Sequence, residues 1–376
     1  MVMNQDQFPI LSQGIYANHA AIAPWPRVTA EAVAAFAEEN VDRGPLGYRD
    51  WISRERSLRE LAAQLIGAES SNDIALLKNT AECVSAVAYG YAFQPGDSVV
   101  IPAGEFPSNR LPWLVQRDRG VDVREVDIRA DDDPETALLA AVDASTRILA
   151  ISSVQFSDGL RIDVSRLGKA CRDRGVLFFV DAIQQLGALP IDASASHVDF
   201  LAASAHKWML GPEGIALFYC RESARAKIDL KQVGWHMYDY PWDFGREDWT
   251  PSVSARRFEA GSPNSLGQVA LHASLQLLLD TGLEEIGQRI LANTAQLMAG
   301  LGSLPGVSIR SPTEPARRSG IVNFSAGDTA NRGVFRKLMS AGVNCALRDG
   351  GIRLSPHYYQ DAAVMKKLLE YVEDAL

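Results

Sequence analysis

Residues 204–214 read Ser-Ala-His-Lys-Trp-Met-Leu-Gly-Pro-Glu-Gly and place Lys207 directly after an apolar segment, 198–203, that carries no charge beyond Asp199. That segment predicts a strand, and the Gly-Pro-x-Gly pattern predicts a loop behind it. In open α/β sheets, ligands bind at the carboxyl ends of strands. A buried lysine there has a lowered pKa and can form a Schiff base. The alternative is a surface lysine whose stem lies along an apolar wall.

Short apolar segments of the same kind precede and follow this one. The predicted strands are residues 74–78, 98–102, 121–126, 147–154, 176–181, 198–203 and 215–220. Their nearly continuous β-branched and apolar composition is typical of strands covered on both faces. Helical patterns, such as residues 80–93 and 164–174, lie between most of them. This alternation predicts an α/β fold with a mainly parallel sheet.

A second region begins near residue 266. It is predicted to contain helices at 266–280, 284–301, 331–341 and 361–375 and short strands at 307–310, 321–325 and 351–355. We therefore expect a large domain over residues 26–265 and a smaller α+β domain over residues 266–376. Residues 1–25 show neither a helical nor a strand periodicity, and we expect them to form an arm that packs with the small domain.

The composition excludes several classes of protein. The 376 residues include 37 Lys plus Arg and 46 Asp plus Glu, a formal net charge of −9, with no cationic run that would favour a nucleic-acid partner. No apolar stretch approaches the ~18 residues of a membrane span, and the first residues do not resemble a signal peptide. The four cysteines form no Cys-x-x-Cys pair and the six histidines no zinc motif. We therefore expect a cytoplasmic protein with reduced thiols and no metal.

Two further segments place polar residues at predicted strand ends. Asp181 ends the strand at 176–181, where a carboxylate can face a cation such as a protonated pyridine nitrogen; the alternative is a cap for a following helix. Residues 78–82, Lys-Asn-Thr-Ala-Glu, stand between a strand and a helix. Backbone N–H groups at a helix N-terminus bind phosphate, and the alternative is simple capping by Thr80. Neither dinucleotide nor P-loop glycine motifs are present, which argues against those nucleotide sites.

An amine nucleophile, a carboxylate for a pyridinium and a phosphate site together are what pyridoxal phosphate (PLP) needs. On these residues the sequence resembles the class V aminotransferase and cysteine desulfurase family, which has the fold-type I PLP-enzyme fold with a seven-stranded sheet. The resemblance covers nearly the whole chain. Its landmarks are residues 16–21 (Tyr-Ala-Asn-His-Ala-Ala), 79–82, 105–109 (Glu-Phe-Pro-Ser-Asn), 180–184 (Val-Asp-Ala-Ile-Gln), 204–214, 258–264 (Phe-Glu-Ala-Gly-Ser-Pro-Asn) and 352–357 (Ile-Arg-Leu-Ser-Pro-His).

The resemblance implies a role for each matched residue. Lys207 would form the Schiff base and then act as acid and base, and Asp181 would pair with the pyridine nitrogen. The other implied cofactor contacts are Gln184 at the ring hydroxyl, Phe106 stacked on the ring, and Thr80, Ala81, Ser204 and His206 at the phosphate.

The resemblance also implies a homodimer and a substrate site. Ser262 would reach the phosphate of the neighbouring subunit, so that the active site is shared. Arg353 would bind the substrate carboxylate, a task that suits a guanidinium fork. Asn18, His19 and Trp235 are further candidates for substrate contact. His236 could also touch the substrate, and its alternative is a packed structural histidine; the alternative for the aromatic segment 234–244 is a subunit-interface loop.

The sequence departs from cysteine desulfurases in two places. Those enzymes have a histidine where this chain has Phe106, and a persulfide-carrying cysteine on a mobile loop ahead of the arginine. Here the nearest cysteine is Cys345, whose apolar neighbours predict a buried and inert thiol. With residues 154–159 and 234–235, this pattern is more similar to the kynureninase and isopenicillin N epimerase-like branches.

We therefore expect a PLP-dependent enzyme that acts on a small α-amino acid through Lys207. The reaction is expected to be transamination or β-elimination, the latter as a C–S or C–Se lyase. The alternatives are an epimerase and a non-catalytic PLP-binding protein. A NAD-dependent enzyme is a further alternative, but the absence of the dinucleotide glycine motif argues against it. The identity of the amino acid, and the need for a keto acid, stay open.

Overall fold

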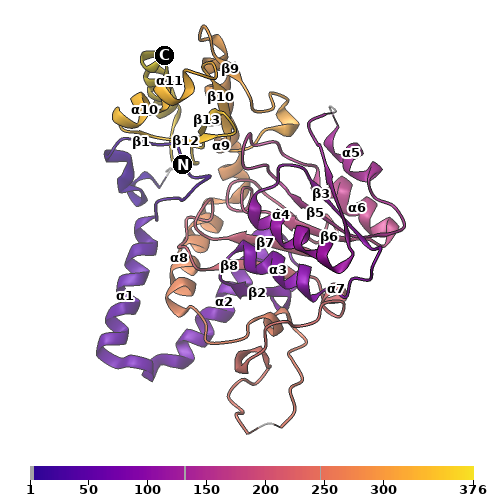
Figure 1. Ribbon diagram of the computed structural model, residues 1–376. Helices are drawn as coiled ribbons and strands as arrows, with labels where there is room; N and C mark the ends of the chain where they lie inside the picture. Colours follow the sequence, from indigo (N-terminus) through magenta and orange to yellow (C-terminus); the bar gives the residue numbers. More distant parts are fainter. Residues whose placement is uncertain (1–3, 131–132, 246) are drawn as a thin grey trace.

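The computed structural model describes residues 4–130, 133–245 and 247–376, and its centre is a seven-stranded sheet (Figure 1). Its strand order is β2 (Ile74–Leu77), β8 (Ala216–Cys220), β7 (Phe200–Ser204), β6 (Leu177–Asp181), β5 (Thr146–Ser152), β3 (Ser98–Pro102) and β4 (Asp122–Val126). Only β8 runs antiparallel to its neighbours. The predicted α/β class and its mainly parallel seven-stranded sheet are therefore confirmed.

Helices cover both faces of this sheet. Their bounds are α1 (Arg27–Arg43), α2 (Tyr48–Ile66), α3 (Thr80–Gly90), α4 (Pro107–Leu114), α5 (Pro134–Ala140), α6 (Val164–Arg174), α7 (Glu222–Arg225) and α8 (Ser265–Thr281). Alternate residues of β5 enter two different cores, Ile148 the one under α3 and α4 and Leu149 the one under α2, α6 and α8. This division follows from the two-residue period of a strand. It is the reason that these strands are apolar throughout.

The C-terminal part of the chain forms a second, smaller sheet. Its order is β12 (Ala346–Arg348), β13 (Gly351–Leu354), β10 (Val322–Ser325) and β9 (Ser308–Ile309), all antiparallel, with α9 (Leu283–Ser303), α10 (Asn331–Ser340) and α11 (Ala362–Ala375). Near the N-terminus, β1 (Ile15–Tyr16) pairs in parallel with β11 (Val343–Asn344). The core of this part includes Ile15 and Ala17. The domain boundaries proposed from the sequence stay a prediction.

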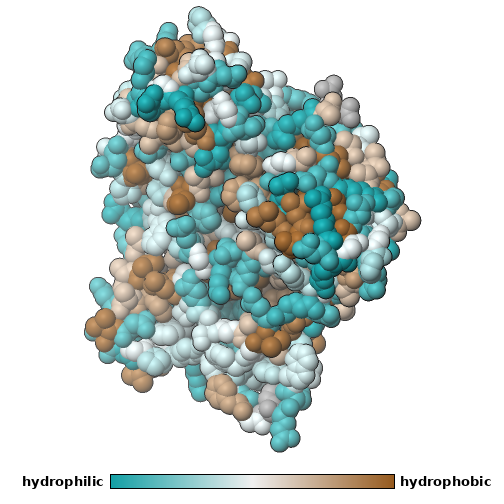
Figure 2. Space-filling view, in the orientation of Figure 1, coloured by the Kyte–Doolittle hydropathy of each residue, from teal (hydrophilic) through white to brown (hydrophobic). Residues whose placement is uncertain are grey.

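The remaining regular segments are short 3-10 helices at Gln5–Gln7, Pro9–Ser12, Gly44–Gly47, Ser71–Asp73, Val115–Arg119, Trp235–Met237, Ala255–Phe258 and Pro315–Arg317. The loop segments over residues 233–245 and 247–250 project from the bottom of the molecule in Figure 1. The face seen in Figure 2 is mainly hydrophilic, with an apolar area over α4; Leu111 of α4 and Val115 directly after it are exposed. Within the described residues, no helix is both long and apolar enough to cross a membrane.

Strand β2 lies at one edge of the large sheet, and a buried ion pair occupies its open side. The Leu76 N–H donates to Glu259 Oε1 at 2.8 Å, and Arg59 Nη1 donates to the Ile74 carbonyl at 2.9 Å. Arg59 also binds both carboxylate oxygens of Glu259, at 2.6 and 2.8 Å. The pair therefore makes the backbone hydrogen bonds that a neighbouring strand would make.

Candidate active site

A cavity of about 510 Å³ opens at the carboxyl ends of β6 and β7. Because parallel strands end at the same edge of a sheet, residues far apart in the sequence meet there. Nine of the residues predicted from the sequence line it: Thr80, Ala81, Phe106, Asp181, Gln184, Ser204, His206, Lys207 and Arg353. It is also lined by Ala20, Ala21, Ile22, Asn79, Ser108, Phe156, Ile183 and Arg348.

Lys207 lies in a tight turn behind β7 and is only 8% exposed. The Leu210 N–H donates to the Lys207 carbonyl at 3.0 Å, and Leu210 has a φ of 58°, a left-handed conformation that is costly for a bulky residue. Burial lowers the pKa of the Lys207 amine, and its Nζ lies 5.6 Å from the centre of the Phe106 ring. A larger share of neutral amine makes Lys207 a better nucleophile.

Asp181 ends β6 and is 1% exposed. Burial raises the pKa of its carboxyl group, while a hydrogen bond from the Ile183 N–H, at 3.0 Å, and the charge of Lys207 act in the opposite direction. A turn follows Asp181 rather than a helix, so the capping alternative is wrong. A buried carboxylate needs a cationic partner, and a pyridinium nitrogen in the cavity would supply one.

The N-terminus of α3 forms the polar end of the cavity. Asn79 is the cap, because its Oδ1 accepts the Glu82 N–H at 2.9 Å; Thr80 is not. The Thr80 N–H and hydroxyl instead pair with Ser204 Oγ, at 2.9 and 3.0 Å. Among the described residues, nothing accepts a hydrogen bond from the Ala81 N–H. Two hydroxyls, a free N–H and the helix dipole form a site that fits a phosphate.

Two arginines form the opposite wall. Asp349 and Gly350, with φ of 50° and 72°, make the two-residue turn between β12 and β13. In this hairpin Arg348 lies opposite Gly351 and Ala346 opposite Arg353, so both guanidinium groups project from the same face. Arg348 was not predicted, although the Asp349-Gly350 turn signal directly after it, three to four residues before Arg353, could have revealed it.

The guanidinium of Arg353 is only partly satisfied. Its Nη1 donates to the Phe156 carbonyl at 2.6 Å, whereas its buried Nε and Nη2 have no acceptor among the described residues. Burial, together with the charge of Arg348, lowers the pKa of Arg353 to about 9. A buried guanidinium with two free donors beside a cavity fits a ligand carboxylate.

Gln184 is held in place from both sides. Its Nε2 donates to the Ala20 carbonyl at 3.0 Å, and its Oε1 accepts the Trp208 indole N–H at 2.9 Å. One amide N–H of Gln184 stays available toward the cavity. It can therefore donate to a ring oxygen of a ligand, as the resemblance implies.

Asn18 and His19 do not line the cavity. His19 is fully buried, donates from Nδ1 to the Ser355 carbonyl at 2.8 Å and accepts the Tyr359 hydroxyl at Nε2 at 2.5 Å. Burial lowers its pKa to about 4. Asn18 forms a backbone bridge with Ser355. His19 is therefore packed away from the cavity, whereas Asn18 is half-buried with an Oδ1 that has no partner among the described residues, and its substrate contact stays a prediction.

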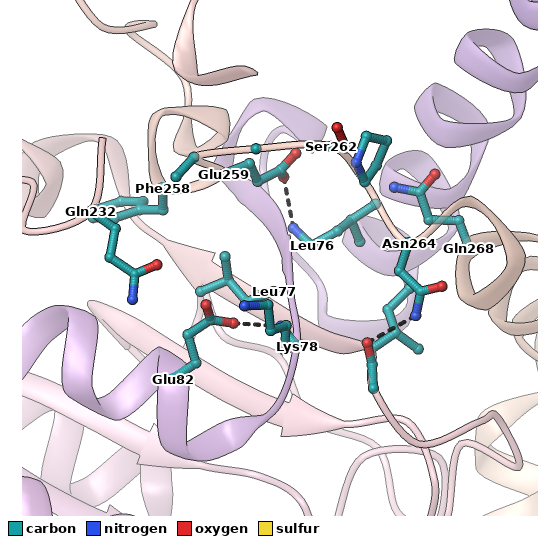
Figure 3. A pocket seen from close by; sticks show the side chains of 15 residues that line it. Leu76, Leu77, Lys78, Glu82, Gln232, Phe258, Glu259, Ser262, Asn264 and Gln268 are labelled. Atoms are coloured by element: carbon teal, nitrogen blue, oxygen red, sulfur yellow. Dashed lines mark hydrogen bonds between the residues drawn. The ribbon is translucent and has the colours of Figure 1, made fainter. Parts of the chain in front are cut away.

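Ser262 and Trp235 lie in two other pockets of the chain. Ser262 lines a pocket of about 290 Å³, shown in Figure 3, together with Glu82, Glu259 and Asn264. Trp235 lines a pocket of about 410 Å³ within the projecting loop. A single chain thus does not bring either residue to Lys207. This separation agrees with the expectation that Ser262 serves a neighbouring subunit.

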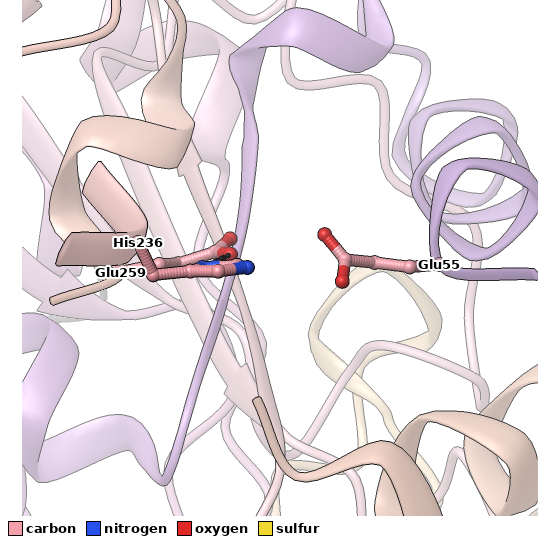
Figure 4. Close-up of side chains that lie close together, drawn as sticks. All are labelled: Glu55, His236 and Glu259. Atoms are coloured by element: carbon pink, nitrogen blue, oxygen red, sulfur yellow. Dashed lines mark ion pairs between the residues drawn. The ribbon is translucent and has the colours of Figure 1, made fainter. Parts of the chain in front are cut away.

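Glu55, His236 and Glu259 form a buried cluster of possible metal ligands (Figure 4). However, Arg59 already binds Glu55 at 2.6 Å as well as both oxygens of Glu259. Arg256 Nη2 also donates to His236 Nε2 at 2.9 Å. Because the two guanidinium charges balance the two carboxylates, we interpret the cluster as an ion-pair network.

All four cysteines are buried and reduced, and none lines the cavity. Cys345 is 4% exposed in the core beneath the small sheet, and burial raises the pKa of its thiol to about 12. A thiol of this kind is a poor nucleophile.

The chain is similar in sequence and in fold to known proteins. The family model "Aminotransferase class-V" matches residues 15–363. A probable cysteine desulfurase of Methanothermobacter thermautotrophicus is 30% identical over 390 residues, covering 97% of this chain and 96% of the relative. A cysteine desulfurase of Serratia proteamaculans is 28% identical, covering 86% of this chain and 82% of the relative.

Solved structures of the protein C-DES have a TM-score of 0.91 to this chain at 25% identity, covering 98% of this chain and 99% of C-DES. One is a C-DES mutant with glycine linked covalently to its PLP cofactor. The other is described as the cystine C–S lyase C-DES in complex with its reaction product, cysteine persulfide. The expected nearness to the kynureninase and epimerase-like branches stays a prediction.

Proposed function

Because the chain belongs to the class-V aminotransferase family, whose members are PLP-dependent enzymes, we propose that it cleaves a carbon–sulfur bond of a small α-amino acid by β-elimination. The observation that carries this proposal is the content of the cavity. It offers one lysine base and a free buried guanidinium, and no cysteine that could take sulfur from the substrate.

The cavity fits PLP. Thr80, Ala81, Ser204 and His206 would hold the phosphate, Phe106 and Gln184 would contact the ring, and Asp181 would pair with its nitrogen. The free Ala81 N–H and the buried Asp181 carboxylate, which forms no ion pair with the described residues, support this assignment. When bound through Lys207, PLP supplies an electron sink for charge that develops at the substrate α-carbon.

Lys207 is the only group of the described cavity wall that we assign as a base. Asp181 would be occupied by the ring nitrogen and His206 by the phosphate, while arginines stay protonated. In our proposal Lys207 takes the α-proton, and the Cβ–S bond breaks with its electron pair leaving on sulfur. Epimerisation would require a second acid on the opposite face of the substrate, and we assign no residue of the described cavity wall to that role.

The position of sulfur after cleavage separates a lyase from a desulfurase. A desulfurase needs an enzyme thiolate within reach of the substrate, and here Cys345 is packed in the small-domain core. We therefore propose that sulfur leaves as a free thiolate or persulfide. C-DES, described as a cystine C–S lyase, is a precedent for such an outcome in this fold.

Arg348 favours a substrate with a second anionic group. Arg353 would bind the α-carboxylate, and Arg348 lies on the same face of the hairpin with its side chain toward the cavity. A disulfide-linked amino acid such as cystine has a second carboxylate that Arg348 would bind.

One titration tests the proposed function. The holoenzyme is mixed separately with cystine, cysteine and alanine while the visible spectrum of the cofactor, pyruvate and released sulfur species are measured. A β-elimination with cystine as the best substrate forms pyruvate and a persulfide without a keto acid. Conversion to the pyridoxamine form that only a keto acid reverses would show a transaminase instead. A spectrum that no amino acid changes would support a non-catalytic PLP protein.

We expect the enzyme to work without any cysteine. Cys345→Ala should keep wild-type kcat and release the same sulfur product, because the thiol is buried away from Lys207. The loss of a small core side chain should lower stability by about 1 kcal/mol. Steady-state kinetics and thermal melting measure the two effects. A variant that folds but has lost turnover would instead indicate a persulfide on Cys345.

We further propose that the enzyme is a cytoplasmic homodimer with a shared active site. The support comes from Ser262, which one chain places outside its own Lys207 cavity, and from the projecting loop, where Tyr240, Phe244 and Trp249 are 64–77% exposed. Exposed aromatic clusters of this kind mark contact surfaces.

Complementation tests the shared site. Ser262→Ala should weaken PLP binding about tenfold or more, because a hydrogen bond to a charged group contributes roughly 1.5–3 kcal/mol. Chains with Ser262→Ala and chains with Lys207→Ala are then refolded together at limiting PLP. If the site is shared, each mixed dimer contains one intact site and activity returns. If Ser262 serves its own chain, no mixed dimer has an intact site and activity stays low.

A further inference from the structure

Glu105 is a buried carboxylate beside the cavity that the proposed chemistry does not use. It is 4% exposed and stands in the loop between β3 and α4, directly before Phe106. No cation of the described residues forms an ion pair with it. Burial raises the pKa of its carboxyl group, whereas hydrogen bonds from Ser152 and Gln155 act to lower it. A buried carboxylate of this kind is costly unless its hydrogen bonds are well made.

Three hydrogen bonds to Glu105 come from the end of β5 and the loop that follows, and the side chain of Asn109 in α4 also acts to lower the pKa of its carboxyl group. Its Oε1 accepts the Ser152 N–H at 2.6 Å and Gln155 Nε2 at 3.0 Å, and its Oε2 accepts the Ser152 hydroxyl. Ser152 lies opposite Asp181 in the β5–β6 register. The carboxylate therefore joins the loop that carries Phe106 to the strand end beside Asp181.

The same loop supports the arginine that faces the cavity. Phe156 follows Gln155, and its carbonyl accepts Arg353 Nη1 at 2.6 Å. Its ring meets that of Phe106 edge to face, with centres 5.2 Å apart and planes at 76°. Phe106 and Arg353, which both line the cavity, are thus both connected to Glu105 through short contacts.

We propose that Glu105 is a positioning residue that sets the separation between the Phe106 ring and the Arg353 guanidinium. With both fixed, the cofactor ring and the α-carboxylate of the substrate are held in one orientation, which presents the α-proton to Lys207. Misplacement by about 1 Å can cost a hundredfold in rate, so such support matters. The part of this proposal that concerns the substrate carboxylate rests on the proposed function, and the part that concerns the Phe106 ring does not.

Three variants separate positioning from folding. Glu105→Gln keeps the size of the side chain but leaves only one oxygen to accept the hydrogen bonds that Ser152 and Gln155 donate to the two carboxylate oxygens of the wild type. Gln155→Leu removes only the donor on the Phe156 side. Glu135→Gln is the control for loss of a buried carboxylate outside the cavity, because Glu135 accepts a backbone N–H from Asp163 at 2.6 Å and, unlike Glu105, also binds Arg317 at 2.5 and 2.6 Å.

The readouts are the visible circular dichroism of bound PLP, the half-saturating concentration of glycine in a spectral titration of the holoenzyme, and the melting temperature of the apoprotein. For Glu105→Gln we expect an altered dichroism band and about tenfold weaker glycine binding, equivalent to about 1.4 kcal/mol. Gln155→Leu should weaken glycine binding and leave the band unchanged. Glu135→Gln should lower the melting temperature alone.

A Glu105→Gln holoenzyme with a wild-type band and wild-type glycine binding would overturn the proposal, whatever its melting temperature. If Glu105→Gln does not fold, unchanged glycine binding in Gln155→Leu overturns it. If wild-type holoenzyme responds to no amino acid, the proposed function fails, and the dichroism band of Glu105→Gln still decides whether Glu105 positions the ring.

Discussion

Lys207→Ala should abolish covalent attachment of PLP and lower turnover at least about 10³-fold, because a positioned acid–base group contributes roughly 10²–10⁴-fold. The visible band of the attached cofactor should be absent from the purified variant. The fold should survive, since the amine of Lys207 forms no hydrogen bond or ion pair with the described residues and its burial is unfavourable. Absorption spectra, steady-state kinetics and thermal melting measure these three effects.

Lys169→Ala is the matched control for that loss of a lysine. Lys169 is exposed on α6 and pairs only with Asp173, at 3.2 Å, so its removal should leave spectrum and turnover unchanged. A Lys207→Ala enzyme with the wild-type spectrum and activity would contradict the assignment of Lys207, and with it the proposed mechanism.

Arg353→Met should produce opposite effects on function and stability. The half-saturating concentration of the amino acid should rise about a hundredfold or more, because hydrogen bonds to charged groups contribute roughly 1.5–3 kcal/mol each. The apoprotein should nevertheless gain about 1 kcal/mol in unfolding free energy, because an apolar side chain replaces a buried cation with two unsatisfied nitrogens. Spectral titration and chemical denaturation test the two parts separately.

Arg310→Met provides the comparison within the same small sheet. Arg310 is exposed and lies 3.7 Å from Asp349, so neither substrate binding nor stability should change much. Destabilised Arg353→Met apoprotein would show that the hydrogen bond to Phe156 outweighs the burial of charge. Unchanged amino-acid binding would remove Arg353 from the substrate site.

The central sheet and the residues at its strand ends could be predicted from the sequence because both signals are local. Strands buried on two faces must be apolar along their whole length, and a charged residue at the end of such a strand stands out, as Asp181 and Lys207 do. Helices α1 and α2 were not predicted. Buried positions of α1 are only Thr29 and Phe36, so its sequence has little apolar periodicity to detect.

The placement of His19 depends on contacts that no local pattern contains. Its two ring nitrogens bond to Ser355 and Tyr359, more than 330 residues away in the sequence. Ser262 shows a second limit, since the resemblance implies that its partner belongs to another copy of the chain. Arg348 shows a third, because its direction depends on strand pairing and on a two-residue turn.

The ion pair of Arg59 and Glu259 at the edge of the large sheet also has a consequence for solubility. A strand of consecutive apolar residues, such as Ile74–Leu77, is a template for aggregation with a second molecule when its edge is left unpaired. Here the side chains of Arg59 and Glu259 form hydrogen bonds with backbone groups of β2 that a second molecule would need in order to pair with the strand. Since Glu259 comes from a segment 183 residues further along the chain, the edge of a nascent protein stays unprotected until that segment is synthesised. Protection against aggregation is therefore acquired late in synthesis.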